Sequence, residues 1–247
     1  MIDIFLDCDN TFGKPDREID DGLLILFLLG HPGVRLHGIS LVYGNGALDD
    51  VVEATRVLLA RLGREDIPLF PGAAEPGVVD RGARDAIARA IADASRRTER
   101  LYLLATGPLT NVAAATEDPS LWEQMAGLAC MGGIQGPLRY PKRQGRELNF
   151  SADPSATLRV LQAKVPLTLF PAESCMETTF GFFSLLRTAG WPGWYRQAVW
   201  SWFRHFSSKY GTRGFYLWDL LPALWLLEPA LFEMERCRLN ESAPETL

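Results

Sequence analysis

Four aspartates near the start of the chain have the residue type and spacing needed to bind a cation or a hydroxyl-rich ligand. An apolar run over residues 2–6 predicts a buried strand, and a second one over 23–29 predicts a helix. Between these runs lie Asp7, Asp9, Asp20 and Asp21. Neighbouring carboxylates repel each other, and a bound cation or sugar relieves that repulsion. Helix capping would explain only the last two, so the cluster predicts a binding site.

The elements that must position these carboxylates alternate between strands and helices. Further strands are predicted over residues 34–42, 67–70, 101–105, 127–130 and 166–170. Helical patterns separate most of them, and this alternation predicts an α/β fold with an open, mostly parallel sheet and helices on both faces. We expect a single domain over residues 1–235, followed by a polar tail over 236–247.

Polar residues and glycines follow several of these strands. Asn45 lies between two glycines, and a pair of glycines follows Cys130 after one residue. Glycines let the backbone approach a ligand and expose main-chain carbonyls that suit calcium, although a plain turn explains each pattern equally well. Ligands of open α/β sheets bind at the carboxyl ends of the strands. The residues expected at that edge are Asp7, Asp9, Asn45, Thr106, Cys130 and Glu147.

Composition and charge exclude several classes of protein. The chain has 247 residues and a formal net charge of −5, which argues against a nucleic-acid-binding surface. It has no uncharged apolar run of about twenty residues, so no membrane span is expected. The N-terminus lacks the features of a signal peptide, and the four cysteines form no paired motif. We therefore expect a cytoplasmic protein with reduced thiols and a small-molecule ligand.

The second half of the chain contains segments with two interpretations. Residues 191–216 are dense in aromatic side chains, which predicts either a core element or a lid that stacks on a flat ring. Asp219 precedes an apolar helix pattern over 220–227 and is either a cap or a ligand. Asp153 and Pro154 have the types of a helix cap and first helical residue, so Asp153 is predicted to be structural.

Taken in order, these motifs resemble those of the inosine–uridine nucleoside hydrolases. The resemblance extends from Asp7 to Pro229. It rests on Asp7-x-Asp9 with Ile19-Asp20-Asp21, Gly44-Asn45, Thr106-Gly107-Pro108-Leu109-Thr110-Asn111, Met131-Gly132-Gly133, Glu147-Leu148-Asn149-Phe150, Asp153-Pro154 and Trp218-Asp219.

The resemblance implies an open α/β hydrolase that uses calcium to cleave the N-glycosidic bond of a ribonucleoside or related N-riboside. The implied calcium ligands are the carboxylates of Asp9, Asp21 and Asp219 and the main-chain carbonyl of Cys130. Asp9 would also take a proton from a calcium-bound water, and Asp7 would support the site. The residues implied to hold the ribose are Asp20, Asn45, Glu147 and Asn149. The resemblance also suggests a homo-oligomer.

The chain departs from the family pattern in two places. The link between the second and third aspartates, residues 10–19, is longer than the compact turn of the family, which could reposition Asp20 and Asp21. Trp218 stands where many members carry a histidine that acts as the acid for the leaving base. The histidines, at 31, 37 and 205, are each predicted to be structural. Our hypothesis is that aromatic stacking, by Trp218 or by a residue from 191–216, helps the leaving group instead.

Two other functions compete with this interpretation. The first is a phosphatase of the haloacid-dehalogenase type, in which Asp7 would be the nucleophile and Asp9 the acid/base, with magnesium. That family needs a lysine and a later acidic pair, whereas the strand after Lys164 leads only to Glu173. The second is a non-catalytic member of the hydrolase family that binds ribose or a nucleoside without turning it over.

Overall fold

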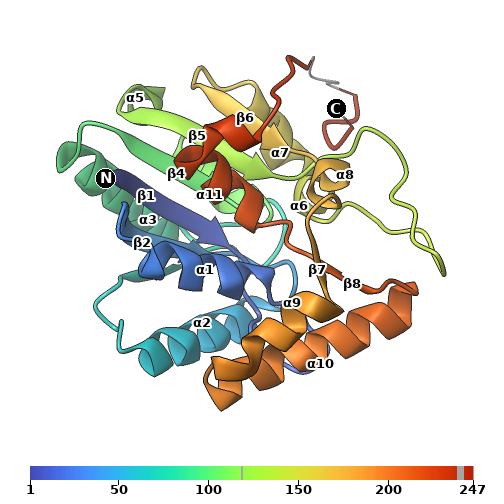
Figure 1. Cartoon of the computed structure of the whole chain (residues 1–247). Coiled ribbons are helices and arrows are strands. Elements are labelled where there is room, and N and C mark those ends of the chain that lie inside the picture. Colours follow the sequence, from blue (N-terminus) through green and yellow to red (C-terminus); the bar gives the residue numbers. More distant parts are fainter. Residues whose placement is uncertain (118, 238–241, 247) are drawn as a thin grey trace.

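A parallel sheet of six strands forms the centre of the protein, in the order β3-β2-β1-β4-β5-β6 (Figure 1). The computed structural model describes residues 1–117, 119–237 and 242–246. The strands are β1 (Ile2–Cys8), β2 (Val34–Leu41), β3 (Leu69–Pro71), β4 (Leu101–Ala105), β5 (Met125–Met131) and β6 (Leu167–Phe170). Every pairing within the sheet is parallel, which confirms the predicted open α/β fold.

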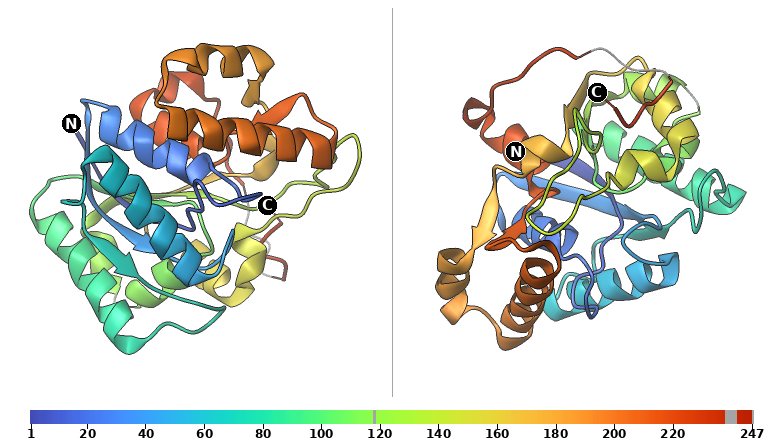
Figure 2. Two further views of the ribbon diagram at one scale, coloured as in Figure 1. Left: turned by 90° about the horizontal axis from the view of Figure 1, so that it is seen from below. Right: turned by 90° about the vertical axis from the view of Figure 1, so that its right-hand side faces the viewer.

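Alternation along β1 sends side chains into two separate cores. Ile4 and Leu6 face one side, where they pack with α1, α2, α10 and α11. Phe5 faces the other side, where it packs with α3, α4, α5 and α7. Figure 2 shows α1 and α10 on one side of the sheet and α3 on the other. The bounds of these helices are α1 (Asp20–Gly30), α2 (Leu48–Leu62), α3 (Arg81–Arg96), α4 (Thr110–Ala115), α5 (Pro119–Glu123), α7 (Pro154–Leu161), α10 (Gly193–Tyr210) and α11 (Leu220–Leu227).

The first strand is two residues longer than predicted. It continues through Asp7 to Cys8, because Asp7 is in register with Ser40 on one side and Ala105 on the other. Ala105 is in turn paired with Cys130. Asp7 therefore lies inside the sheet rather than after it, and Ser40, Asp7, Ala105 and Cys130 form one row across four strands.

A small aromatic subdomain covers one end of the sheet. Two antiparallel strands, β7 (Thr179–Gly181) and β8 (Gly214–Tyr216), are joined through the long helix α10. The rings of Phe180 and Phe215 stack across the strands, with centroids 4.9 Å apart. The remaining short elements are α6 (Asn149–Ala152), α8 (Ala172–Cys175), α9 (Phe182–Leu186), η1 (Arg187–Gly190) and η2 (Pro229–Leu231).

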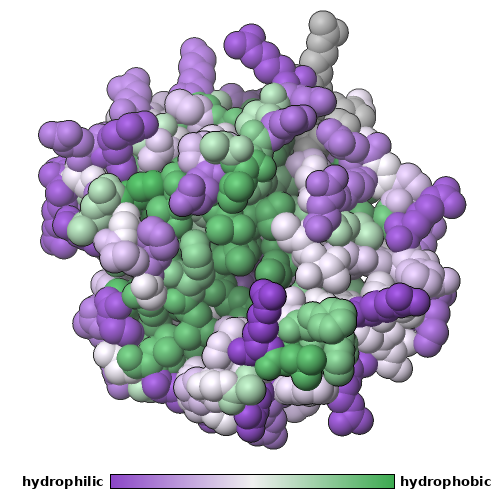
Figure 3. Space-filling view, viewed as in Figure 1, coloured by the Kyte–Doolittle hydropathy of each residue, from purple (hydrophilic) through white to green (hydrophobic). Residues whose placement is uncertain are grey.

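The outer surface is apolar over α1 and α11, two helices whose sequences are hydrophobic almost throughout. Figure 3 shows this apolar surface over the middle of the face seen in Figure 1. A second exposed apolar group, Phe182, Phe183 and Leu186, lies on α9. Within the described residues, no helix combines the length and the hydrophobicity needed to cross a membrane.

The segment predicted as a polar tail, residues 236–247, is described only in part, because 238–241 and 247 lie outside the described residues. Its end lies against the domain: the Ile134 N–H donates to the Glu245 carbonyl at 2.7 Å, and Ile134 forms a bridge with Thr246.

Asp153 is the structural cap that the sequence predicts, and it also ties three segments together. Its carboxylate accepts hydrogen bonds from Ala156 N–H at 3.0 Å, from Gly77 N–H at 2.8 Å and from Thr110 Oγ1 at 2.8 Å. The side chain is 3% exposed, so water cannot replace these bonds easily. It fixes α4 and α7 behind the carboxyl ends of β4 and β5.

We expect Asp153→Ala to lower the free energy of unfolding by about 2–4 kcal/mol, since three donors lose their acceptor. The matched control is Asp80→Ala, because exposed Asp80 caps α3 through one bond to Ala83 N–H and its loss should cost about 1 kcal/mol. Urea unfolding followed by circular dichroism measures both. Equal costs for the two variants would contradict the bridging role of Asp153.

Candidate active site

Asp7 anchors the carboxyl edge of the sheet from below. Its Oδ1 accepts a hydrogen bond from Asn111 Nδ2 at 2.9 Å and a second from the Ser40 hydroxyl. Asn111 also donates to the Leu41 carbonyl at 3.0 Å and accepts from Ala73 N–H at 2.7 Å. Burial raises the pKa of Asp7 to about 7, although the bonds from Ser40 and Asn111 oppose that rise. Asp7 therefore connects β1 to β2 and to α4 beneath the edge of the sheet.

Asp9 is held by the loop that follows β2. The Asn45 N–H donates to Asp9 Oδ2 at 2.6 Å, and Asn45 Nδ2 donates to Oδ1 at 3.2 Å. This contact requires glycine at position 44, because a Cβ there would lie 1.9 Å from Asp9 Oδ2. Gly44 also has a φ of 154°, which side chains disfavour. The glycine pattern around Asn45 is therefore a close approach to a site residue rather than a plain turn.

The long link between residues 10 and 19 does not displace the later aspartates. Asp20 and Asp21 form the first turn of α1, next to Asp9 and to Asp219 at the start of α11. Thr106 Oγ1 donates to Asp21 Oδ1 at 2.6 Å, and the Asp219 N–H donates to Asp20 Oδ2 at 3.3 Å. All four carboxylates are buried. The structure thus brings together residues from both ends of the chain.

These four carboxylates form two close pairs. The carboxyl group of Asp9 lies close enough to that of Asp21, and that of Asp20 to that of Asp219, for each to act electrostatically on the other. Burial, together with neighbouring carboxylates, raises the pKa of Asp21 and of Asp219 well above the usual value. The pKa of Asp9 rises to about 7 and that of Asp20 to about 6, both mainly through burial. Each pair shares protons unless a cation replaces them.

The donor set suits an oxygen-seeking cation. Asp20 Oδ1 and Asp21 Oδ2 are buried without a hydrogen-bond partner, and calcium is bound by carboxylate and carbonyl oxygens. Cys130 is the last but one residue of β5, in register with Ala105, and its side chain is fully buried in the second core. Across the described ranges, no three His, Cys, Asp or Glu side chains already stand in metal-binding geometry.

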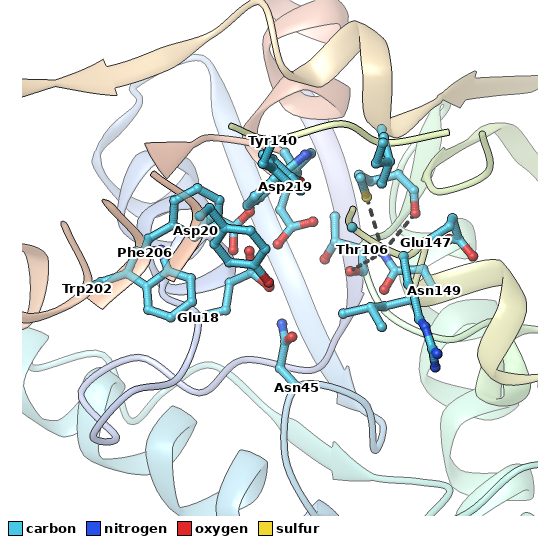
Figure 4. A pocket seen from close by; sticks show the side chains of 18 residues that line it. Glu18, Asp20, Asn45, Thr106, Tyr140, Glu147, Asn149, Trp202, Phe206 and Asp219 are labelled. Carbon is cyan, nitrogen blue, oxygen red and sulfur yellow. Dashed lines mark hydrogen bonds between the residues drawn. The ribbon is translucent and has the colours of Figure 1, made fainter. Parts of the chain in front are cut away.

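A pocket of about 100 Å³ opens above the carboxylates (Figure 4). Asp20, Asn45, Thr106 and Asp219 line it on the side of the sheet edge, and Glu147 and Asn149 line it from the 147–149 segment. Its remaining wall is aromatic. The aromatic residues that line it are Tyr140, Trp202, Phe206, Tyr210 and Trp218.

Glu147 and Asn149 make extensive contacts with the backbone. Glu147 Oε1 accepts from the Phe150 N–H at 2.8 Å and the Gly133 N–H at 3.2 Å, while Oε2 accepts from the Ser151 N–H at 2.7 Å. Asn149 Nδ2 donates to the carbonyls of Thr106 and Met131, each at 3.0 Å. Both side chains are therefore fixed in position, and the amide oxygen of Asn149 is the part of that group left for a ligand.

The aromatic segment 191–216 serves as both core and pocket wall. Trp202 and Phe206 are buried in α10 and also line the pocket. The Phe206 ring lies 5.6 Å from the Trp218 ring, centroid to centroid. The sequence left a core element and an aromatic lid as alternative roles for this segment. Trp202 and Phe206 of α10 belong to the core and to the pocket wall at once.

The three histidines stay outside the pocket. His37 Nε2 lies 2.7 Å from Asp3 Oδ1, His31 Nδ1 accepts from the Gly33 N–H at 3.1 Å, and His205 Nδ1 lies 2.9 Å from Asp16 Oδ1. Their placement agrees with the structural roles predicted for them, and none lines the pocket among the described residues.

Sequence reasoning missed three residues of the site. Glu18 lines the pocket, and burial together with Asp20 and Asp21 raises its pKa well above the usual value. Tyr140 belongs to an irregular basic segment, and Asn111 had been quoted within a motif without a role. No periodic pattern marked Glu18 or Tyr140, whereas the buried amide of Asn111 beside a buried strand was a usable signal.

Comparison with known proteins gives consistent matches over the chain. A family model described as inosine-uridine preferring nucleoside hydrolase matches residues 4–243. The pyrimidine-specific ribonucleoside hydrolase RihA of Shewanella oneidensis is 25% identical, over 95% of this chain and 80% of its own length. The non-specific ribonucleoside hydrolase RihC of Escherichia coli is 28% identical, over 96% of this chain and 82% of its own.

A solved structure shares the fold. The purine-preferring ribonucleoside hydrolase from Gardnerella vaginalis superimposes with a TM-score of 0.81, covering 99% of this chain and 86% of that one at 19% sequence identity. The likeness supports the same arrangement of sheet and covering helices.

The crowding of carboxylates makes a prediction about stability in the absence of metal. We expect Asp21→Asn to raise the free energy of unfolding in EDTA by about 1 kcal/mol or more, because it removes one buried charge. The new amide still accepts from Thr106 and can donate to Asp9. Thermal unfolding with and without EDTA measures the effect.

The control for this experiment is Asp66→Asn, since Asp66 is an exposed partner of Arg64 and should contribute little. A metal-free Asp21→Asn protein that is less stable than the parent would show that the carboxylates are not in mutual repulsion.

Proposed function

This chain belongs to the inosine-uridine preferring nucleoside hydrolase family, and from this membership we propose that it uses calcium and Asp9 to cleave a riboside. It is an N-glycosidase that hydrolyses ribonucleosides. The proposal adds the cation, the base and the ribose-binding residues. The observation that carries it is the pair of buried, unpartnered oxygens on Asp20 and Asp21 beside Asp9 and Asp219.

The proposed calcium ligands are the carboxylates of Asp9, Asp21 and Asp219 and the main-chain carbonyl of Cys130. Calcium accepts six to eight oxygens in irregular arrangements, which suits groups drawn from the end of β1, from β5 and from the starts of α1 and α11. When bound, it would lower the pKa of a water and orient it toward the sugar. The supporting bonds from Thr106 to Asp21 and from Asn45 to Asp9 would orient two of these ligands.

Asp9 is the proposed base for the attacking water. The N–H of Asn45 donates to one carboxylate oxygen of Asp9 at 2.6 Å, which would orient the group for proton transfer from the water. In the reaction the bond between C1′ and the base nitrogen breaks with its electron pair going to that nitrogen, which takes up a proton from solvent, while the water oxygen bonds to C1′ and the proton of that water passes to Asp9. Positive charge builds on the sugar, and the acidic pocket stabilises it.

The ribose would be held by Asp20, Asn45, Glu147 and Asn149. All four line the pocket, and each has a hydrogen bond to the backbone or to a carboxylate. Side chains fixed in advance lose little entropy when the sugar binds, which favours productive geometry at C1′. Asp7 would act beneath them by holding β1, β2 and α4 together.

The phosphatase interpretation loses its support at Glu173. That residue, the first acidic group after the strand that follows Lys164, accepts hydrogen bonds from the N–H groups of Gln135 and Gly136. It therefore anchors a loop, and the residues on either side of it, Ala172 and Ser174, are not acidic. The family match over residues 4–243 favours the hydrolase instead.

We expect reducing sugar to be released from at least one of inosine, guanosine, uridine and cytidine in calcium, and EDTA to abolish the release. Asp9→Asn should lower kcat about 100- to 10,000-fold, because the amide cannot accept the proton. Asp66→Asn, a surface change of the same chemistry, should leave kcat unchanged. Isothermal calorimetry of the parent protein should show calcium binding.

Other results would favour the alternatives. Calcium and ribose binding without turnover would indicate a non-catalytic member of the family. Faster release of phosphate from a phosphomonoester than of ribose from any nucleoside would revive the phosphatase function. Undiminished turnover in EDTA would contradict the calcium dependence and leave the glycosidase function in place.

Trp218 is proposed to stack on the leaving base. It lines the pocket and is fixed edge-on by Phe206 and Tyr216, whose ring centroids lie 5.6 and 5.3 Å from its own. We expect Trp218→Ala to lower kcat/KM about 10-fold or more and Trp218→Phe to recover part of the loss. Trp200→Ala, on the outer side of α10, is the control. Full turnover by Trp218→Ala on every cleaved nucleoside would contradict the stacking role.

A further inference from the structure

Glu18 brings into the pocket a carboxylate that none of the roles above uses. It belongs to the long link between residues 10 and 19 and lines the pocket together with Asn45. Figure 4 shows its carboxyl group directed toward the centre of the pocket, between Phe206 and Asn45. It therefore stands where the ribose-binding residues meet the aromatic wall.

The link that carries Glu18 is fastened at several points. Lys14 pairs with Asp50 at 3.1 Å and also with Glu53, both on α2. Asp16 lies 2.9 Å from His205 on α10, which ties the link to the aromatic helix. These contacts hold the loop against two helices, so the position of Glu18 is built into the fold.

Two short-range contacts fix the end of the link. Thr11 Oγ1 donates to the Glu18 carbonyl at 2.9 Å, and Arg17 Nη1 donates to the Asn45 carbonyl at 2.9 Å. Arg17 thereby joins the link to the loop that holds Asp9. The carboxylate of Glu18 is placed next to the substrate-binding residues by backbone and side-chain contacts that do not involve the carboxylate itself.

The pocket combines negative charge with aromatic faces. Its lining has four carboxylates, those of Glu18, Asp20, Glu147 and Asp219, against one basic side chain, the exposed Arg146. Lys209 acts electrostatically on Glu18, but its ammonium lies 5.3 Å from the Tyr210 ring centroid. Aromatic faces and a carboxylate together attract a flat organic cation. Such a guest would also relieve the repulsion between Glu18 and its acidic neighbours.

We propose that Glu18 is a specificity-determining residue that selects ribosides whose leaving group is a positively charged nitrogen heterocycle, such as an N-ribosylpyridinium. This inference rests on the proposed glycosidase function. The C1′–N bond breaks and its electron pair goes to the ring nitrogen, which becomes neutral. The water oxygen bonds to C1′, and the proton of that water passes to Asp9. The products are ribose and a neutral heterocycle, so the leaving group needs no acid.

This chemistry agrees with the composition of the pocket. A neutral nucleobase leaves more readily when an acid protonates it, and within the described residues no histidine lines the pocket. A cationic heterocycle already carries the charge that protonation would supply. The lack of a histidine among the described lining residues and the presence of Glu18 thus both favour a cationic leaving group.

The first test compares nicotinamide riboside, which is cationic, with uridine and inosine. We expect the parent protein to prefer the cationic substrate in kcat/KM. Glu18→Gln keeps the size of the side chain and removes its charge, and it should reduce that preference about 10-fold or more. Glu65→Gln makes the same charge change at an exposed position and should leave the preference intact.

The second test measures binding without turnover. Calorimetry compares 1-methylnicotinamide, a cation, with nicotinamide, its neutral counterpart. The parent and Glu65→Gln should bind the cation more tightly, and Glu18→Gln should lose that difference. Circular dichroism confirms that Glu18→Gln is folded.

Three results would overturn the inference. These are equal losses for cationic and neutral substrates, no preference for the cation in the parent, and a selective loss on uridine and inosine, which would make Glu18 a proton donor. Cleavage of neutral nucleosides without charge preference would leave the proposed function standing. Charge-selective binding lost in Glu18→Gln, without cleavage of any riboside, would support the inference and reject the function.

Discussion

Repulsion among buried carboxylates is the constraint on which the rest of the structure depends. Asp9, Asp20, Asp21 and Asp219 are all at most 4% exposed, and they lie close enough to act electrostatically on one another. Acidic groups so placed favour their protonated forms, and the fold keeps them together only through the rigid elements behind them. Such an arrangement lowers the stability of the empty protein in exchange for affinity toward a cation and a positively charged transition state.

The surrounding fold supplies that rigidity in successive layers. The parallel register aligns Ser40, Asp7, Ala105 and Cys130, so that one row of the sheet forms the floor. Asn111 then joins Asp7 to the loops that follow β2 and β3. Above the floor, glycine at position 44 lets a loop come into contact with Asp9. Each layer uses ordinary polar contacts, and together they define the positions of the acidic groups.

Sequence alone was enough for the sheet and for the acidic cluster after its first strand, because strand periodicity and residue spacing record these features locally, whereas the place of Asp219 beside that cluster was implied only by the family resemblance. It could not place Glu18, since the 10–19 link is irregular and its course depends on contacts with α2 and α10. It also ended β1 at residue 6, because an aspartate within a buried strand contradicts propensity and is tolerated only through Asn111. The two uses of the 191–216 aromatics needed the helix orientation, which pattern alone does not give.

The contact between Asp20 and Asp219 joins positions 199 residues apart. During synthesis, the N-terminal acidic residues leave the ribosome long before α10 and α11 exist to cover them. A partly made chain therefore exposes an open, strongly negative edge that cannot close around a ligand. The enclosed chamber is completed only when α10 and α11 have emerged, so the pocket cannot form on a nascent chain that ends before them.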